Sequence, residues 1–385
     1  MQSTPRQRLL EFAHILQGVL FERIEQEVGP LNDKGRLLVA VMGMLGLSRH
    51  VASRRWRGRP PSSRHALTTA FLAKAVYGLE TTRQLLERLR VDRQLRCVCG
   101  WNSARALPHE STFSRAFAEF SQSELPQRMH AALIAETQKD RLIGHIARDS
   151  TAIEARERFP ETQPKRKQKK RRPKRAKASE RGTRLERQRK QSLAQQLAGL
   201  PRACGIGVKK SSQGHERYWR GYKLHADVAD GQIPISLLLT GANVHDSQAA
   251  IPLMTMTTQR VQYLYDLADA AYDAKAIREH SVQLGHKPII DHPKRRRKIG
   301  ERKVPLRKNS RSWTLVAETE TRAEEMTWAE QERFAERTMV ERVFSRLKDE
   351  FGARLIRVRG ADKIMAHLMF GVIALTVDQL LKLTG

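Results

Sequence analysis

The amino-acid sequence predicts an α/β protein, with a mixed five-stranded sheet flanked by helices and preceded by an all-α N-terminal region. Up to about residue 140, apolar residues recur at helical spacing, as in "RLLVAVMGMLGL" and "ALTTAFLAKAVYGL". From Gly144 onward, alternating and β-branched runs replace that pattern. Segments with helical spacing separate the later runs, which is typical of a mixed sheet covered by helices.

Five segments are expected to be strands. The first, "GHIARDSTAIE", is predicted to end as a strand at Asp149. The second and third, "YWRGYKLHADVAD" and "IPISLLLTGAN", meet at Asp230-Gly231, a strong hairpin signal. The fourth is the apolar run Tyr263–Ala268, and the fifth is "KPIID". In an open sheet the first and fourth strands are often neighbours, and their ends project into one crevice.

Helices are expected between and after these strands. "DSQAAIPLMTMTTQRV" and "AKAIREHSVQLG" follow the third and fourth strands, and "FAERTMVERVFSRLKDEFG" follows the fifth. The apolar run Ala366–Val377 is predicted to be a buried C-terminal helix, because twelve residues are too few to span a bilayer.

We expect two domains, residues 1–140 and 141–385, with insertions in the second at about 160–212 and 293–330. The first insertion carries residues 164–190, with 15 lysines and arginines against two glutamates. Such a tract cannot collapse without anions, so it is predicted to be disordered or partly helical. The second insertion repeats the pattern in residues 294–308, with nine basic residues and one glutamate.

The charge of the chain points to a nucleic-acid partner. With 71 lysines and arginines against 41 acidic residues, the formal net charge is +30. A membrane-surface role is the competing interpretation, but no long basic amphipathic helix with an aromatic face is evident. Cys97, Cys99 and Cys204 cannot form a disulfide framework or a zinc site of the usual spacing. We therefore expect no membrane association, and a cytoplasmic, nucleoid-associated location.

A candidate DNA contact lies in "LPHESTFSRAFAEF". Ser111, Thr112 and Arg115 fall in the first turns of a predicted helix, with Phe113 and Phe117 facing inward. Hydroxyls and an arginine at a helix N-terminus suit contact with DNA phosphates or base edges. Simple N-capping of a bundle helix is the alternative interpretation.

Three acidic residues are candidates for catalysis. Asp149 and Asp269 follow the first and fourth strands, and Glu341 lies on the helix after the fifth. Carboxylates that meet in one place repel one another unless cations intervene, and hard Mg²⁺ favours carboxylate and phosphate oxygens. Two such ions can drive phosphodiester chemistry, with Mn²⁺ as a substitute. Taken singly, each carboxylate is readily explained as a solvated surface group, as most Asp and Glu residues are, but the pattern of all three together is much harder to explain by accident.

Glu341 is expected to border the buried face of its helix. Phe334, Arg337, Glu341 and Lys348 fall within an arc of about 60° at about 100° per residue, beside an apolar stripe. Arg337 and Lys348 would then contact the phosphates of the reacting strand.

These residues carry a resemblance to a known family. "FAERTMVERVFSRLK" resembles the Y-x2-R-x3-E-x6-K signature of bacterial insertion-sequence transposases of the DDE type, although Phe334 stands where the signature has tyrosine. "RDST" at 148–151 and "ADAAYD" at 268–273, with Tyr272, resemble the first and second aspartate motifs. "RGYKLHADV", which contains Lys223, and "ANVHDSQ" resemble flanking segments, and "HESTFSR" is similar to part of the terminal-repeat-binding region.

The resemblance implies an RNase H-like catalytic domain and a DNA transposase. It implies that Asp149, Asp269 and Glu341 are catalytic and hold two Mg²⁺ ions, and that Lys223 contacts DNA with Arg337 and Lys348. The implied partners are terminal inverted repeats and target DNA, with at least a homodimer on DNA because two element ends are paired. A non-catalytic DNA-binding protein derived from a silenced transposase is the alternative, and a nuclease without strand transfer is a third interpretation.

Five further positions are weaker candidates. His245 and Asp246 follow the third strand near the expected crevice, or form a simple capped loop. Trp313 and Trp328 precede the Glu341 helix, where they either stack on an unpaired base or pack against the protein. Trp219 is expected to stiffen the second strand.

Overall fold

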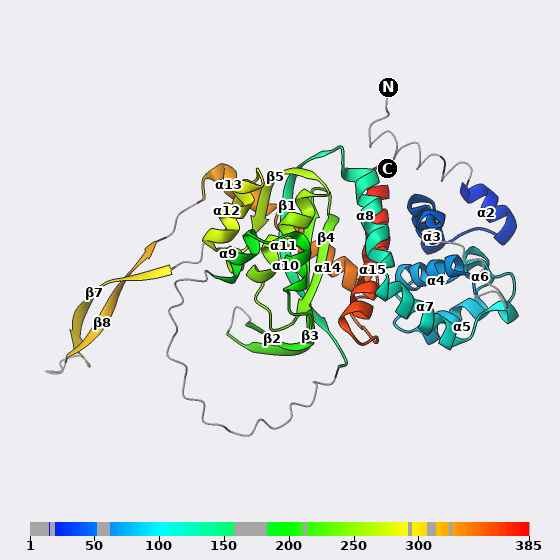
Figure 1. Ribbon diagram of the computed structural model, residues 1–385, viewed down its shortest axis with the longest axis horizontal. Coiled ribbons are helices and arrows are strands. Elements are labelled where there is room, and N and C mark those ends of the chain that lie inside the picture. Colours follow the sequence, from blue (N-terminus) through cyan, green and yellow to red (C-terminus); the bar gives the residue numbers. More distant parts are fainter. Residues whose placement is uncertain are drawn as a thin grey trace, which may run out of the picture.

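The structure, a computed structural model, describes Ile15 and residues 20–51, 62–157, 183–210, 214–291, 295–305, 313–322 and 326–384. For residues 295–305 and 313–322 it describes the backbone alone. The mixed α/β architecture is confirmed, with an N-terminal helical region beside an open mixed sheet (Figure 1).

Within the described parts of the chain, the main sheet has six strands, one more than expected. The five expected strands are β1 (Leu142–Glu154), β3 (Glu216–Ala229), β4 (Ile233–Gly241), β5 (Gln262–Ala268) and β6 (Lys287–Ile290). The sixth, β2 (Gly205–Lys210), lies in the region expected to be an insertion. β4 pairs with residues 222–229 of β3, and β2 pairs with residues 216–221.

β1 is the central strand of the sheet. It pairs antiparallel with β3 on one side and parallel with β5 on the other, so the first and fourth expected strands are neighbours as predicted. The prediction that β1 ends at Asp149 is wrong. Its ladder with β5 stops at Arg148↔Ala268, but its ladder with β3 continues to Glu154↔Gly221 and keeps the strand extended. The predicted hairpin at Asp230-Gly231 is confirmed between β3 and β4.

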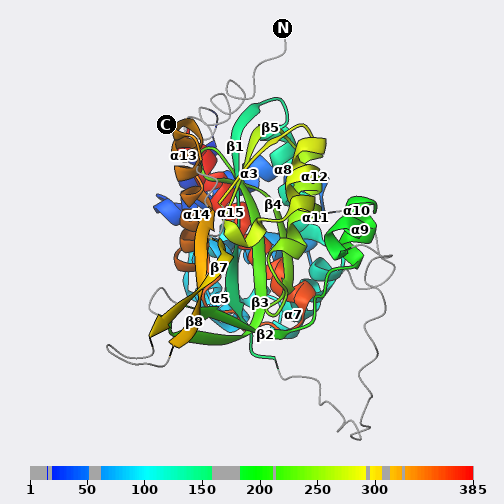
Figure 2. The same ribbon diagram turned by 90° about the vertical axis from the view of Figure 1, so that its left-hand side faces the viewer.

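Helices cover both faces of the sheet (Figure 2). α11 (Ser247–Thr258) packs on β3 and β4, and α12 (Lys275–Gln283) packs on β6. On the opposite face, α14 (Thr338–Asp349) packs on β1 and β3, and α15 (Ala361–Lys382) packs on β4. Figure 2 shows α14 and α12 on opposite sides of the strands.

A buried ion cluster ties three strands together. Arg148 of β1 donates from Nη2 to Asp227 of β3 at 2.8 Å and to Asp266 of β5 at 3.1 Å. All three side chains are at most 1% exposed, and Thr257 of α11 also donates to Asp227. Because side chains alternate along a strand, Arg148 points toward α11 and Asp149 points toward the opposite face, where α14 lies.

The N-terminal region is helical, as expected. Its helices are α2 (Phe21–Val28), α3 (Asp33–Leu45), α4 (Arg64–Val76), α5 (Thr82–Val91), α6 (Arg93–Val98), α7 (Glu110–Gln122) and α8 (Leu125–Gln138). Side-chain caps begin several of them, such as Asn32, Ser63 and the capping box of Thr81. Short 3₁₀ turns lie at Leu47–Arg49 and Ala104–Ala106.

The C-terminal helix joins this region to the sheet. α15 packs against α3, α4, α7 and α8 as well as β4, and a single cluster of buried apolar residues extends from the N-terminal helices into the sheet (Figure 1). At 22 residues, α15 is longer than the apolar run suggested, and by length and composition it could cross a membrane. However, 83% of its most apolar window is buried inside the protein, which is typical of a core helix, as predicted.

The two basic insertions are only partly described. Of the tract at 164–190, residues 164–182 lie outside the described residues, and the remainder forms α9 (Arg184–Arg189), followed by α10 (Leu193–Ala198). In the second insertion, β7 (Arg295–Pro305) and β8 (Trp313–Arg322) form an antiparallel hairpin that projects away from the sheet (Figure 1). Cys97, Cys99 and Cys204 are free thiols, in agreement with the prediction.

Candidate active site

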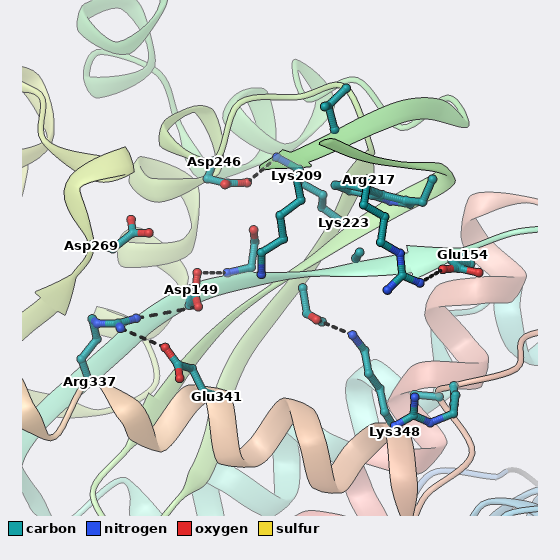
Figure 3. A pocket seen from close by; sticks show the side chains of 17 residues that line it. Asp149, Glu154, Lys209, Arg217, Lys223, Asp246, Asp269, Arg337, Glu341 and Lys348 are labelled. Atoms are coloured by element: carbon teal, nitrogen blue, oxygen red, sulfur yellow. Dashed lines mark hydrogen bonds and ion pairs between the residues drawn. The ribbon is translucent and has the colours of Figure 1, made fainter. Parts of the chain in front are cut away.

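A cleft of about 530 Å³ opens between the end of the β1–β5 ladder and α14. Asp149, Asp269 and Glu341 all line it, and they come from β1, the end of β5 and α14 (Figure 3). Its lining also includes several basic residues, namely Lys209, Arg217, Lys223, Arg337, Lys348 and Arg354. Figure 3 shows the carboxylates of Asp149, Asp269 and Glu341 toward one end and Arg217 and Glu154 toward the other.

The register of the sheet brings the two aspartates together. The parallel ladder of β1 and β5 ends at the pair Arg148↔Ala268, and Asp149 and Asp269 are the next residues on each strand. Neighbouring strands lie about 4.8 Å apart. The Asp149 carboxylate accepts from the backbone N–H of Ser150 at 2.7 Å, and that of Asp269 accepts from the N–H of Ala271 at 3.0 Å. Both carboxylates are therefore held by their own backbone.

Burial makes these aspartates hard to ionise. Desolvation raises the pKa of Asp149 to about 6, and the neighbouring charge of Asp269 adds to the effect, while the Ser150 N–H and Arg337 oppose it. Desolvation also raises the pKa of Asp269, with Arg337 again acting in the opposite direction. Two carboxylates of this kind favour a nearby cation.

Arg337 is the cation that the structure places there. Its guanidinium donates from Nη2 to Glu341 at 2.9 Å, and its Nη1 lies 3.9 Å from Asp149 Oδ2. The expected single helix from Phe334 to Gly352 is wrong, because α13 (Trp328–Ala335) ends before Arg337 and α14 begins after it. Arg337 is the N-cap of α14 but keeps helical dihedrals, φ −52° and ψ −29°, so its i,i+4 relation to Glu341 survives.

Glu341 is more exposed than its helical position suggested. Its side chain is 53% exposed, while the apolar stripe beside it, Val340, Val343, Phe344 and Leu347, is buried as expected. The Phe334 ring, which stands where the signature has tyrosine, lies against the Arg337 guanidinium at 5.7 Å. Phe334 therefore supports the arginine by a cation–π contact.

The predicted DNA-contact residues divide into two groups. Lys348 lines the cleft and donates to the hydroxyl of Thr151 at 2.6 Å, and Lys223 lines it and bonds to Asp246 at 2.9 Å. Burial lowers the pKa of Lys348, and nearby Arg354 and Lys209 add to this. Both lysines are thus partly enclosed, and their contact with DNA stays a prediction.

The second group lies on α7, outside the cleft lining. Ser111 and Arg115 are exposed, and Phe113 and Phe117 are buried as expected. The cap of α7 is His109, whose Nδ1 accepts from the N–H of Ser111 at 3.2 Å. Neither Ser111 nor Thr112 is therefore the cap, and their contact with DNA stays a prediction.

Several cleft residues were missed or underrated from sequence. Asp246 lines the cleft beside Lys223, so of the pair His245 and Asp246 it is the aspartate that belongs to the site. Lys209 on β2 and Arg217 on β3 form a basic wall. In the sequence, only the basic residues that flank the "RGYKLHADV" segment pointed to them. β2 itself was not recognised as a strand.

The predictions for the three tryptophans named from the sequence differ in how they compare with the structure. Trp219 is 9% exposed, lines the cleft and donates to the carbonyl of Tyr222 at 3.2 Å, which agrees with a stiffening role. Trp328 is 76% exposed, so the packing interpretation is wrong for this residue. The side chain of Trp313 lies outside the described residues.

The carboxylate oxygens of Asp149, Asp269 and Glu341 are ligands of the kind that hard divalent cations prefer. Among the residues described, no group of three or more His, Cys, Asp or Glu side chains could hold a metal ion as they stand. Carboxylate oxygens from three elements nevertheless face one cleft, and Arg337 supplies positive charge between two of them. The hydroxyl of Tyr272 is fully buried and has no hydrogen-bond partner within the described chain. Burial raises its pKa, and the charges of Asp246, Asp149 and Asp269 add to the rise.

Comparison with known families agrees with this geometry. A family model described as "Transposase DDE domain" matches residues 140–377, which is more than half of the chain, and a second described as "Transposase domain" matches residues 21–119. No curated protein matches the chain. The first family acts on DNA with divalent metal ions, and its RNase H-like fold accords with the open mixed sheet seen here. The resemblance found in the sequence is confirmed, and the chain belongs to the insertion-sequence transposases with a DDE domain.

Proposed function

We propose that this transposase binds the terminal inverted repeats of its insertion sequence, cleaves the element ends and transfers them to target DNA, with Asp149, Asp269 and Glu341 as its catalytic carboxylates. The observation that carries the proposal is that these three side chains, from three separate elements, line one cleft with a basic wall. Mg²⁺ is the proposed cofactor, as two ions, with Mn²⁺ able to substitute.

The proposed mechanism assigns a task to each group. Two Mg²⁺ ions, when bound, supply Lewis-acid stabilisation of the attacking and leaving oxygens of the phosphodiester. Asp149 of β1 and Asp269, directly after β5, would hold the ions, and Glu341 would complete the donor set from α14. Arg337, once released from the carboxylates, is positioned to contact the phosphate of the reacting strand. Lys348 and Lys223 supply positive charge along the same cleft.

The experiment is a cleavage and strand-transfer assay on DNA with the element's own terminal repeats and Mg²⁺ or Mn²⁺. Asp149→Asn, Asp269→Asn and Glu341→Gln should each lower activity by about 100-fold or more, the scale seen when one transition-state stabilising group is removed. Glu332→Gln is the matched control, because Glu332 is an exposed carboxylate of α13 outside the cleft lining. Full activity in Glu341→Gln would refute the role given to that residue.

The products separate the three interpretations of function. Joined element–target molecules indicate a transposase, and cleavage without joining indicates a nuclease. Salt-sensitive binding with no metal-dependent cleavage by the wild-type protein, and indifference to Asp149→Asn, indicate a non-catalytic DNA-binding protein. Because two ends must be paired, we also propose at least a homodimer on DNA, which mass measurement of the protein–DNA complex tests.

A further inference from the structure

A second groove, of about 380 Å³, continues the cleft from its basic end. Glu154, Arg217, Trp219 and Arg354 line both spaces, so the two are contiguous. The groove lies where the end of β1, the start of β3 and the chain after α14 meet. We call it the arginine groove after its five arginines: Arg156, Arg217, Arg220, Arg354 and Arg357.

The lining of the arginine groove is strongly basic. Among the described residues that line it, Glu154 is the one carboxylate against five arginines, and Arg354 pairs with exposed Asp349 just outside the lining. It pairs with Arg217 at 2.9 Å, but the two side chains are 62% and 81% exposed. Arg357 pairs with Glu80 at 3.2 Å, also at the surface. Exposed ion pairs of this kind contribute little, so a polyanion competes for the arginines at small cost.

Exposed apolar surface lies among the arginines. Tyr218 is 61% exposed and Leu355 is 47% exposed, and both line the groove. Arg220 donates to the backbone carbonyl of Glu157 at 3.2 Å. Basic side chains next to an exposed aromatic ring are the combination by which proteins hold single nucleic-acid strands, with phosphates on the cations and a base on the ring.

We propose that the arginine groove binds one DNA strand where it leaves the active cleft, with its phosphates on the arginines and a base against Tyr218. The proposal rests on the proposed function, because it extends the path of that substrate. From Asp149 to Glu154, β1 advances five residues, or about 17 Å at about 3.3 Å per residue. That span matches about five nucleotides of a strand that keeps the stacked spacing of about 3.4 Å per nucleotide that it has in a duplex. The groove therefore holds the strand about five nucleotides from the reacting phosphate.

The first test measures how DNA binding depends on salt. Fluorescence anisotropy with a labelled oligonucleotide, in EDTA to exclude metal, compares the wild type with Arg156→Gln/Arg220→Gln/Arg357→Gln. Each lost phosphate contact lowers the slope of log affinity against log salt by about 0.7 for a single strand. We therefore expect the triple variant to lose about 2 from the slope. The control, Arg141→Gln/Lys275→Gln/Lys382→Gln, removes three exposed charges outside the groove lining. The proposal is overturned if both triple variants lose the same amount of slope, or if the groove variant loses none.

The second test uses strand length. Substrates extend about two, five or eight nucleotides beyond the cleavage position, on one side and then on the other. Wild-type affinity should rise between about two and eight nucleotides on one side only, and the groove triple variant should lose this rise. Tyr218→Ala should weaken binding of the longest substrate, while Tyr218→Phe should preserve it because the ring remains. Affinity that ignores length on both sides contradicts the assignment.

The two proposals fail in different ways. Binding in EDTA reports on the groove whether or not cleavage occurs. Cleavage that survives Asp149→Asn refutes the proposed catalytic carboxylates but leaves the groove result intact. Normal cleavage chemistry, combined with salt and length profiles that the groove variants leave unchanged, refutes only the groove.

Discussion

At the scale of single residues, Arg337 has two competing partners. Its guanidinium lies between Glu341 and Asp149, and its charge counters the rise in the pKa of Asp269. Under the proposed function, divalent ions require those same carboxylates. The metal and the arginine are therefore expected to exclude each other, and Arg337 becomes available to a DNA phosphate only after the exchange.

Arg337→Gln should bind Mn²⁺ more tightly than the wild type in the absence of DNA, by up to roughly fivefold. The reason is that an ion pair with a half-exposed glutamate, worth up to about 1 kcal/mol, no longer opposes the metal. Isothermal titration or the electron spin resonance of free Mn²⁺ measures the affinity. Arg342→Gln is the control, because Arg342 lies one residue from Glu341 but outside the cleft lining and bonds to Thr338. Weaker Mn²⁺ binding in Arg337→Gln would show that the arginine organises the site instead of competing for it.

Asp149 is predicted to make stability depend on pH. Burial raises its pKa in the folded protein to about 6, against an ordinary value of 3.8. Below about pH 4 the carboxyl is protonated in both the folded and the unfolded chain, so it has no effect. Between about pH 4 and pH 6 the unfolded chain ionises first, and the free energy of unfolding falls. Above about pH 6 the carboxyl is ionised in both the folded and the unfolded chain, so the loss in the free energy of unfolding no longer changes with pH.

Asp149→Asn removes this cost and should be more stable than the wild type in EDTA at pH 7. A tenfold change in proton affinity corresponds to about 1.4 kcal/mol, and the pKa rises by about two units, so the gain is on the order of 3 kcal/mol. The gain should shrink as pH falls toward about 4.5. Urea unfolding at a series of pH values measures it, with Glu332→Gln as an exposed control. A gain that stays the same at every pH would assign the effect to packing instead.

At the scale of elements, the basic wall of the cleft depends on where β3 changes partners. Gly221 lies at that point, opposite Glu154 of β1 and Gly205 of β2. Its φ is +149°, and a Cβ there would come within 2.0 Å of the carbonyl oxygen of Ile153. The residue must be glycine both for its backbone conformation and for the close approach of β1.

Gly221→Ala should therefore lower the free energy of unfolding by about 2–4 kcal/mol, through backbone strain and overpacking together. Gly285→Ala is a matched control, because Gly285 also has a positive φ, +90°, but open space around its Cα. That control should cost only about 1–2 kcal/mol. Urea unfolding at constant m-value measures both. Equal losses in the two variants would show that the contact with Ile153 relaxes without penalty.

The same elements show what the sequence could and could not predict. The closeness of Asp149 and Asp269 could be predicted from strand order alone. Each of them directly follows the last residue pair of the parallel ladder between β1 and β5. β2 was missed because Gly205 and Gly207 weaken its strand pattern. Tertiary packing compensates, since the Trp219 ring lies over Gly207 where a Cβ would clash. Nor does a proline or glycine mark the break between α13 and α14, so local propensity predicted one helix.

At the scale of the whole molecule, the N-terminal helices help to position the rim of the cleft. The chain between α14 and α15 supplies Arg354 to the cleft and Arg357 to the arginine groove. Gly352 lies in the same chain segment, and His367 of α15 links buried Lys74 of α4 to its carbonyl. The link lies in a closely packed region, because burial lowers the pKa of Lys74 to about 8 and that of His367 to about 3.

The shared core predicts that the N-terminal helices and the sheet unfold together. Phe370 of α15 stacks on Phe71 of α4 and contacts Phe117 of α7, within the cluster that also contains the sheet's Leu224 and Ile146. Phe370→Ala should therefore destabilise both regions by about 3–5 kcal/mol. Fluorescence of variants that keep only Trp101 or only Trp219 reports on each region in urea, and the two midpoints should coincide and fall together. Val282→Ala, at a position 62% exposed, should leave both unchanged. Two separate transitions, with Phe370→Ala moving only the one seen by Trp101, would mean that the N-terminal helices form an independent unit and that the rim of the cleft does not depend on them.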